Sequence, residues 1–448
     1  LVDALSHGRA GEAREVGEFG ARAGLAVTQQ LEEAARRGEG RAADIKGPRH
    51  EFSKAHTPKL VTVRSLMKER LQKVVRGVQN VDMALATTQS TSVPRIGMLG
   101  AGFMASVHSR AARTAGAQLD ALASARPESG ARAVAELGYT RQLDPAALVS
   151  EWFDVVHVCT PNDRHAEYAS AALRAGSHVI CEKPLATSAL AAQRLVDEAA
   201  SAGRLGAVPF VYRYHPMVRE ARARVTDGTT GRLLTVSGQY LQDWLLGADD
   251  ENWRVGSQAG GPSRAFADIG SHLVDLIEFV CGERIVRLAA TARTVHAQRA
   301  GHPVDTEDAV ALIVEFESGA IGSLMVSQVA PGRKNGLVLE LAGTEESLRF
   351  EQEDPERLWV GRRGASQLLR RDPDQLSPDA ARLCLVPAGH PQGYQDAFNA
   401  FVADAYAVAR GESRDGLPTF TDGLRAAVIT EAVLESARSE RWVEVSAR

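Results

Sequence analysis

A lysine stands where it could stabilise negative charge on a reacting oxygen. Lys183 follows an apolar run, His178–Cys181, that predicts a buried strand. Its side chain should therefore lie at the carboxyl edge of a sheet, where ligands bind in open α/β folds. Pro184 restricts Lys183 to extended backbone and stiffens the turn. Taken alone, Glu182 and Lys183 are better explained as solvated loop charges before a helix, and the rest of the chain has to decide.

A carboxylate and an imidazole occur together further along the chain. Asp268 and His272 are four residues apart at the start of an expected helix, Ile269–Val280. Residues at this spacing share one helix face, so both can act on one small molecule. A histidine oriented by a carboxylate can take the proton of an alcohol. Asp268 could instead cap the helix with His272 as its partner, and the sequence leaves both interpretations open.

A glycine-rich turn predicts a dinucleotide site. Gly100-x-Gly102-x-x-Ala105 follows an expected strand, Arg95–Leu99, and opens a helix that begins near Phe103. The first glycine permits the tight turn, the second lets backbone approach a pyrophosphate, and the small third residue lets helix pack on strand. The motif alone is weak, but its position between strand and helix strengthens it.

The end of the second expected strand, Gln118–Ala123, bears on cofactor choice. An acidic residue there binds the ribose 2′-hydroxyl of NAD. This chain has Ser124, with Arg126 two residues on. A serine and an arginine suit a 2′-phosphate, so the sequence favours NADP with use of NAD open. Arg126 could equally be a solvated surface charge.

The order of elements predicts two domains after an extension. Strands alternate with helices over 93–213, which indicates a parallel sheet in an α/β Rossmann domain. Over 214–448 strand-like runs follow one another, which indicates an α+β domain with an open, mostly antiparallel sheet. Residues 1–92 form an N-terminal extension, helical in part (about Leu25–Arg37 and Ser65–Val75) or poorly ordered. Because the chain starts at Leu1, part of this extension is expected not to belong to the native protein.

Composition excludes several classes of protein. The 448 residues have 44% hydrophobic content, enough for real cores, and a net charge of −4, which argues against nucleic-acid binding as the main role. No apolar run reaches the roughly 18 residues of a membrane span. The spacing of cysteines and histidines predicts no metal site. The cysteines form no CxxC pair and read as reduced thiols, so we expect a cytoplasmic protein; they are Cys159, Cys181, Cys281 and Cys384.

Five motifs in this order resemble the glucose–fructose oxidoreductase / inositol dehydrogenase (Gfo/Idh/MocA) family. The resemblance runs from about Val93 to the end of the chain. The motifs are Gly100–Ala105, Thr160–His165, Glu182-Lys183-Pro184, Tyr212-Arg213-Tyr214 and Asp268-x-x-x-His272. The resemblance implies reversible hydride transfer between NADP or NAD and a carbinol carbon of a sugar, cyclitol or related polyol. It also implies a homodimer or homotetramer.

The resemblance assigns residues to the cofactor and the chemistry. It makes Lys183, Asp268 and His272 catalytic and implies a cis peptide bond before Pro184. Val211 departs from the family pattern, in which many members have asparagine. The residues that the resemblance and the motifs place at the cofactor are Gly100, Gly102, Phe103, Met104, Ser124, Arg126, Thr160, Pro161, Asn162, His165, Glu182, Lys183, Arg213, Trp253 and Arg254.

The mechanism expected from these residues is alcohol oxidation. His272 takes the hydroxyl proton, Asp268 orients His272 and stabilises its cation, and Lys183 stabilises the alkoxide. A glycoside-cleaving enzyme that oxidises its substrate only transiently is a second interpretation. A ligand sensor on the same fold is a third, and it ranks last because such proteins are expected to lose the lysine or the acid–histidine pair.

Overall fold

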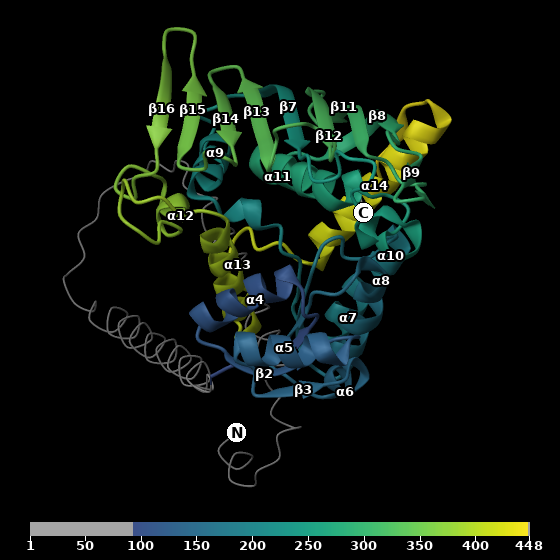
Figure 1. The fold of residues 1–448 in the computed structure, drawn as a ribbon. Helices are drawn as coiled ribbons and strands as arrows, with labels where there is room; N and C mark the ends of the chain where they lie inside the picture. The colour runs from purple at the N-terminus through teal and green to yellow at the C-terminus, as the bar shows by residue number, and fades with distance from the viewer. Residues whose placement is uncertain (1–92, 447–448) are drawn as a thin grey trace, which may run out of the picture. The chain divides into compact units, whose positions relative to one another are not determined.

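The computed structural model describes residues 93–446, which belong to one compact unit (Figure 1). The extension over residues 1–92, including both of its expected helices, lies outside the described residues. Two large sheets organise the described part, and the site lies between them. None of the helices within residues 93–446 is long and apolar enough to cross a bilayer.

The first sheet is parallel throughout, in the strand order β3-β2-β1-β4-β5-β6. This is the order of a doubly wound dinucleotide-binding fold. Its strands are β1 (Arg95–Leu99), β2 (Gln118–Ala123), β3 (Arg141–Leu143), β4 (Val155–Val158), β5 (His178–Cys181) and β6 (Gly206–Ala207). The helices between them are α4 (Phe103–Thr114), α5 (Pro127–Leu137), α6 (Pro145–Ser150), α7 (His165–Arg174) and α8 (Ala189–Ala202).

The register of the central strands brings three turns to one edge. Leu99 pairs with Val158, and Val158 pairs with Cys181, so β1, β4 and β5 end side by side. Cys181 is fully buried, as expected for a strand covered on both faces. The glycine-rich turn, the Thr160 turn and the Lys183 turn therefore share the carboxyl edge of the sheet, as the sequence predicts.

The second sheet has the order β16-β15-β14-β13-β7-β12-β11-β8-β17 (Figure 1). Its pairs are antiparallel except β7 with β12, which confirms the prediction of a mostly antiparallel sheet. The strands are β7 (Leu233–Leu241), β8 (Ile285–Arg293), β11 (Ala309–Phe316), β12 (Ile321–Ser327), β13 (Gly336–Gly343), β14 (Ser347–Glu351), β15 (Arg357–Gly361), β16 (Ser366–Arg370) and β17 (Val443–Glu444). A small hairpin pairs β9 (Gln298–Arg299) with β10 (His302–Pro303).

Helices cover one face of the second sheet and complete the site. Helix α11 packs on β7 and β13, and its apolar residues form one core with those strands. The remaining helical segments are η1 (Asn162–Arg164), η2 (Val211–Tyr214), α9 (Pro216–Thr226), η3 (Trp253–Val255), α10 (Ser257–Gly260), η4 (Phe266–Gly270), α11 (Ser271–Cys281), α12 (Pro378–Ala381), α13 (Tyr394–Ala409) and α14 (Phe420–Ser439).

Helix α13 returns from the second half of the chain to the first sheet. It packs beside α4 (Figure 1), and Phe398, Phe401 and Tyr406 share a buried core with Ile96 and Met98 of β1. The sequence prediction placed this helix with the second domain. Long-range packing of this kind leaves no mark in local periodicity, and it joins the two domains firmly.

Candidate active site

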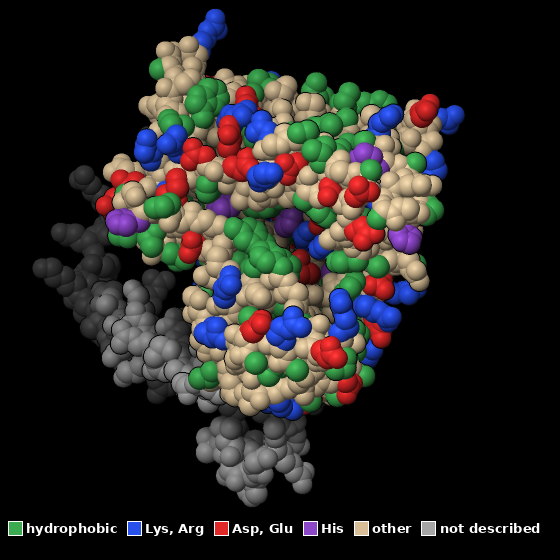
Figure 2. All heavy atoms as spheres, in the orientation of Figure 1, with side chains coloured by type: hydrophobic (Ala, Val, Ile, Leu, Met, Phe, Trp, Pro, Cys, Tyr) green, Lys and Arg blue, Asp and Glu red, His purple; other side chains and the backbone are tan. Residues whose placement is uncertain are grey.

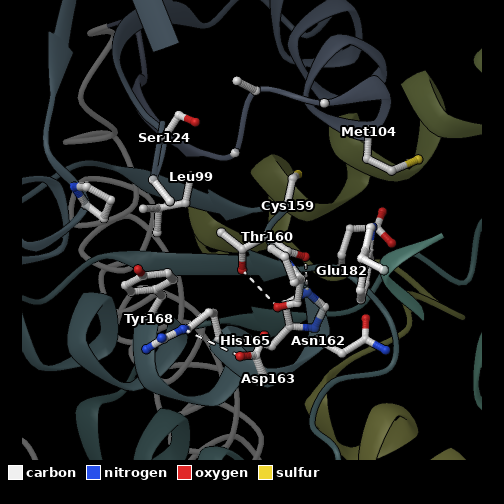
Figure 3. Close-up of a pocket in the computed structure, with 18 of the residues that line it drawn as sticks. Leu99, Met104, Ser124, Cys159, Thr160, Asn162, Asp163, His165, Tyr168 and Glu182 are labelled. Carbon is white, nitrogen blue, oxygen red and sulfur yellow. Dashed lines mark hydrogen bonds and ion pairs between the residues drawn. The ribbon is translucent and has the colours of Figure 1, made fainter. Parts of the chain in front are cut away.

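A cleft of about 780 Å³ runs along the carboxyl edge of the first sheet (Figure 3). In that view Ser124 lies on one side and Glu182 on the other, with Thr160 between them. Of the fifteen residues predicted at the cofactor, all but Arg213 line this cleft: Gly100, Gly102, Phe103, Met104, Ser124, Arg126, Thr160, Pro161, Asn162, His165, Glu182, Lys183, Trp253 and Arg254.

The glycine-rich turn fits a dinucleotide. Gly100 has φ +113°, and a Cβ there would lie 2.3 Å from the Cys159 carbonyl oxygen, so a side chain is excluded. A Cβ on Gly102 would meet nothing within 4 Å, because that position faces the open cleft. Helix α4 begins at the next residue and directs its free N–H groups toward the cleft. This geometry leaves room for a pyrophosphate beside the start of the helix.

Two buried side chains hold the neighbouring turns in place. His165 has Nε2 2.9 Å from the carbonyl oxygen of Thr160 and Nδ1 2.7 Å from that of Pro184, so its ring bridges two turns. Burial lowers the pKa of His165. Asn162 donates from Nδ2 to the carbonyl oxygen of Gly260 at 2.8 Å, which ties the Rossmann domain to the second domain. The peptide bond from Lys183 to Pro184 is cis, as the resemblance implies.

A second cavity of about 300 Å³ adjoins the cleft. Figure 2 shows a hollow between the two domains, with hydrophobic side chains gathered beside it. The side chains that line both cavities are Phe103, Met104, Glu182, Lys183 and Arg254. The second cavity is lined further by Pro209, Tyr212, Tyr240, Gln242, Asp268, Ile269, His272, Asn335 and Tyr394. The redox end of a bound dinucleotide and a small substrate would meet where the two cavities join.

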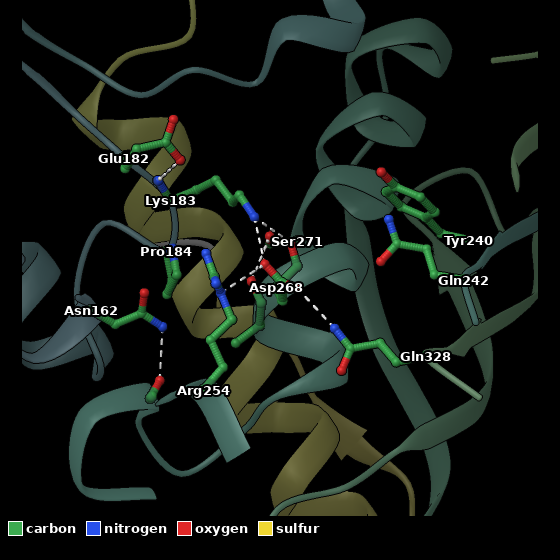
Figure 4. A network of polar contacts seen from close by, with 12 residues as sticks. Asn162, Glu182, Lys183, Pro184, Tyr240, Gln242, Arg254, Asp268, Ser271 and Gln328 are labelled. Carbon is green, nitrogen blue, oxygen red and sulfur yellow. Dashed lines mark hydrogen bonds and ion pairs between the residues drawn. The ribbon is translucent and has the colours of Figure 1, made fainter. Parts of the chain in front are cut away.

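Asp268 is the centre of the polar network at this junction (Figure 4). Its Oδ1 accepts from Lys183 Nζ at 2.7 Å, and its main-chain oxygen accepts from the same amine at 2.9 Å. Gln328 donates to Oδ2 at 2.8 Å. Arg254 Nε lies 3.6 Å from Asp268 Oδ1, and the guanidinium of Arg254 stacks on the Trp253 ring with its carbon 4.2 Å from the ring centroid. Although burial opposes ionisation, the Lys183 and Arg254 charges lower the pKa of Asp268 to about 2.

Asp268 does not orient His272, which differs from our prediction. Both carboxylate oxygens are used by Lys183 and Gln328, and the described structure has no hydrogen bond between Asp268 and His272. The cause is local geometry: Phe266–Gly270 forms a π-helical turn, and the α-helix begins only at Ser271. The spacing of four therefore does not align the two side chains as it would in an α-helix.

His272 lies in an aromatic environment beside the substrate cavity. Its ring packs edge-on against Phe210 and Tyr212, with centroids 5.6 and 5.0 Å apart, and its Nδ1 has no hydrogen-bond partner in the described residues. Burial, followed by the Lys183 charge, lowers the pKa of His272 to about 3. The imidazole is therefore neutral at pH 7, which is the protonation state that a general base requires.

Arg213 is turned away from both cavities. It donates from Nε to Asp275 Oδ2 at 2.8 Å and from Nη2 to Asp422 Oδ1 at 2.7 Å, and its guanidinium stacks on the Phe279 ring. These contacts join η2, α11 and α14. The prediction that Arg213 binds the cofactor does not fit this placement, because the 3₁₀ turn at Val211–Tyr214 directs neighbouring side chains to different sides.

Comparison with known proteins agrees with this architecture. Residues 94–210 match the oxidoreductase family with an NAD-binding Rossmann fold, and residues 218–349 match the GFO/IDH/MocA C-terminal domain. The chain is also 31% identical over 392 residues to levoglucosan dehydrogenase of Pseudarthrobacter phenanthrenivorans, covering 78% of this chain and 97% of the relative. The chain belongs to the Gfo/Idh/MocA family. It is an oxidoreductase with an NAD-binding domain.

Solved structures of Gfo/Idh/MocA proteins have the same fold. Levoglucosan dehydrogenase in complex with NADH and levoglucosan superposes with a TM-score of 0.75 at 30% identity, over 80% of this chain and all of that one. An inositol dehydrogenase homologue from Azotobacter vinelandii, complexed with NADH and myo-inositol, gives 0.71 at 27% identity, over 80% of this chain and 99% of that one.

The sequence motifs do not reveal a hydrogen-bonded group of side chains in the second cavity. Tyr240 donates to Asn335 Oδ1 at 2.5 Å and lies 2.6 Å from the Tyr212 hydroxyl, and Gln242 donates to the same Asn335 oxygen at 3.1 Å. Gln328 was missed as well. Tyr240, Gln242 and Gln328 lie at or near the ends of adjacent strands β7 and β12, so strand pairing was the signal that could have found them. Among residues 93–446 no group of three or more His, Cys, Asp or Glu side chains is placed to hold a metal ion.

Proposed function

We propose that this protein oxidises a secondary hydroxyl of an uncharged, monosaccharide-sized cyclic polyol, an anhydrosugar such as levoglucosan first among the candidates. The Lys183–Asp268 pair at the junction of the two cavities carries the proposal. Hydroxyl, amide and aromatic groups line the rest of the second cavity and suit the polar edges and apolar faces of a sugar ring. The lysine and the arginine of this cavity, Lys183 and Arg254, both face Asp268. Because their charges are already directed to a carboxylate, the cavity disfavours a phosphorylated substrate.

The residues of the cavity have separate roles in this proposal. Lys183 has three donors, two of which are held by Asp268, and the amine stabilises the substrate oxygen as its proton leaves. His272 takes that proton, and Asp268 fixes the lysine rather than the histidine. Bound nicotinamide dinucleotide supplies the hydride acceptor. Phe103 and Met104 line both cavities and supply apolar surface beside the junction.

A substrate panel tests the proposed function. We expect levoglucosan or myo-inositol to give NADH or NADPH in a ratio of one per sugar oxidised, and glucose-6-phosphate to react much more slowly. The measurement is absorbance of reduced cofactor beside sugar consumption. Sugar consumption without accumulation of reduced cofactor would indicate the transient-oxidation mechanism instead. Failure of every polyol, with cofactor bound, would refute the substrate class.

Arg126 is expected to set the balance between NADP and NAD. Its backbone N–H donates to Ser124 Oγ at 3.3 Å, and both residues line the cleft at the end of β2. If the guanidinium contacts a 2′-phosphate, Arg126→Ala should raise KM for NADP about tenfold and leave KM for NAD within about twofold. Steady-state kinetics with both cofactors check this. Arg110, another arginine of the Rossmann domain but outside both cavities, provides the control variant Arg110→Ala, and equal losses for both cofactors would contradict the assignment.

A cytoplasmic location and a homodimer or homotetramer remain part of this proposal. Two of the four cysteines are buried, and all four are free thiols, which is compatible with a reducing compartment. Sedimentation of the purified full chain measures the oligomeric state.

A further inference from the structure

A chain of four buried polar side chains ends at the active-site carboxylate of Glu182. Glu182 Oε1 lies 3.0 Å from His108 Nε2, His108 Nδ1 lies 2.8 Å from His157 Nδ1, and His157 Nε2 lies 2.8 Å from the Tyr406 hydroxyl. Both histidines are fully buried, and the other two residues are at least nine-tenths buried. The four come from α4, β4, the end of β5 and α13, so only the tertiary fold brings them together.

The partners fix the direction of donation along this chain. A carboxylate only accepts, so His108 carries its hydrogen on Nε2 and, when neutral, offers Nδ1 as an acceptor. His157 must then donate from Nδ1, which leaves its Nε2 to accept from the Tyr406 hydroxyl. Every hydrogen has an acceptor, and each donor is neutral. The opposite direction would require Glu182 to carry a proton, which the lowered pKa of this carboxyl opposes.

Neutral donors stabilise a buried anion without cancelling its charge. Within residues 93–446 no lysine or arginine lies within ion-pair distance of Glu182, because Lys183 directs its amine to Asp268. In the part of the chain that the structure describes, the second carboxylate oxygen accepts only from the Lys183 backbone N–H, at 3.2 Å (Figure 4). Although burial opposes ionisation, the hydrogen bond from His108 and, to a smaller extent, the nearby charge of Lys183 lower the pKa of Glu182. The other titratable groups facing Glu182 are His165, His272, Cys159, Cys181 and Tyr394.

Glu182 lies where a charge would act on the nicotinamide. It lines both the dinucleotide cleft and the substrate cavity, on the opposite side of the cleft from Ser124 (Figure 3). The nicotinamide ring is cationic when oxidised and neutral when reduced. A fixed negative charge near that ring therefore attracts the oxidised form more strongly, and the difference is large in a site of low dielectric.

We propose that His108, His157 and Tyr406 keep Glu182 ionised as a chain of neutral donors, and that this charge makes the protein bind oxidised cofactor in preference to reduced cofactor. The proposal rests on the proposed function only in requiring that a nicotinamide dinucleotide binds in the cleft. Its consequence in the oxidative direction is easier release of the reduced cofactor after turnover.

Equilibrium binding of NAD+ and NADH, without sugar, tests the proposal. Glu182→Gln keeps the size of the side chain and removes its charge. We expect Kd for NAD+ to rise about tenfold while Kd for NADH stays within about twofold, a change of about 30 mV in the potential of the bound couple. NADH fluorescence and displacement by NAD+ measure both constants. An unchanged ratio in Glu182→Gln would overturn the proposal, whereas a wild-type protein that binds neither cofactor would instead refute the proposed function.

Two variants at His108 separate a neutral donor from a cation. His108→Gln retains a donor for Glu182 and an acceptor for His157, so the ratio of the two Kd values should stay as in the wild type. His108→Leu removes the hydrogen-bond donor from the buried Glu182 carboxylate, so the carboxylate takes up a proton. The ratio of the two Kd values should then shift as in Glu182→Gln. If His108 were cationic, His108→Gln would tighten NAD+ binding, and the neutral-donor chain would be wrong.

Tyr406, the residue of this hydrogen-bonded series farthest from Glu182, has a matched control variant that separates an effect on cofactor binding from a loss of stability. Tyr406→Phe and Tyr139→Phe each remove one buried hydroxyl. The Tyr139 hydroxyl lies 2.9 Å from the hydroxyl of Ser109, which is in helix α4 next to His108, but it is not connected to Glu182. Both variants should lower the melting temperature, but only Tyr406→Phe should shift the ratio, by about twofold in the direction of Glu182→Gln. Equal ratios in the two variants would remove Tyr406 from the proposal.

Discussion

Replacing Lys183 with methionine should lower turnover about 10³-fold while Kd for the cofactor changes by less than about threefold. The reason is the position of the amine, held by two oxygens of Asp268 at the junction of the two cavities. Methionine keeps the length and most of the packing of lysine but donates no hydrogen bond. Single-turnover kinetics and cofactor titration measure the two effects separately.

Lys334→Met provides the control for this prediction. Lys334 also binds an aspartate, Asp243, at 2.7 Å, but its side chain is 76% exposed and lies outside both cavities, so activity should stay near that of the wild type. The double variant Lys183→Met/Asp268→Asn removes both charges of the buried pair and should recover stability but not turnover. Equal losses of turnover and cofactor affinity in Lys183→Met would make Lys183 a cofactor anchor only.

Replacing His272 with asparagine should lower kcat of sugar oxidation about 10²–10⁴-fold if its imidazole is the proton acceptor. The ring lines the substrate cavity and is neutral at pH 7. His215→Asn is the matched control. His215 is also buried, its pKa is lowered to about 4 by burial, and its ring stacks on Tyr212, but it lines neither cavity. Steady-state turnover within a few-fold of the wild type in His272→Asn would refute the assignment.

The same histidine predicts an unusual pH profile. A base must be unprotonated to act, and a pKa of about 3 keeps His272 unprotonated well below the ordinary histidine value of 6.5. For sugar oxidation, kcat/KM should therefore fall little between pH 7 and pH 5 on account of this group, instead of losing about tenfold per unit below pH 6.5. Initial rates across this range check the profile. A fall in kcat/KM toward acid pH with a midpoint near pH 6.5 would contradict the buried, neutral imidazole.

Much of the fold and cofactor cleft could be predicted because their signals are local. The turn at Gly100 needs a residue without a side chain, and the parallel strands must end at one edge, so the order of motifs placed Thr160 and Lys183 beside it. Strand bounds such as Arg95–Leu99 and Gln118–Ala123 follow from their apolar residues and were predicted as observed. Family membership followed from the same motifs.

The sequence by itself determined the Rossmann turn, the strand edge at Lys183 and the class of reaction, because each depends on residues close together in the chain. Only the tertiary structure decided the partners of Asp268, which are Lys183, 85 residues before it, and Gln328, 60 residues after it. The π-helical turn at Phe266–Gly270 kept His272 from taking their place. The tertiary structure also directed Arg213 away from the cleft and brought His108, His157 and Tyr406 to Glu182. Side-chain direction and long-range packing set these contacts, and neither is encoded in local spacing.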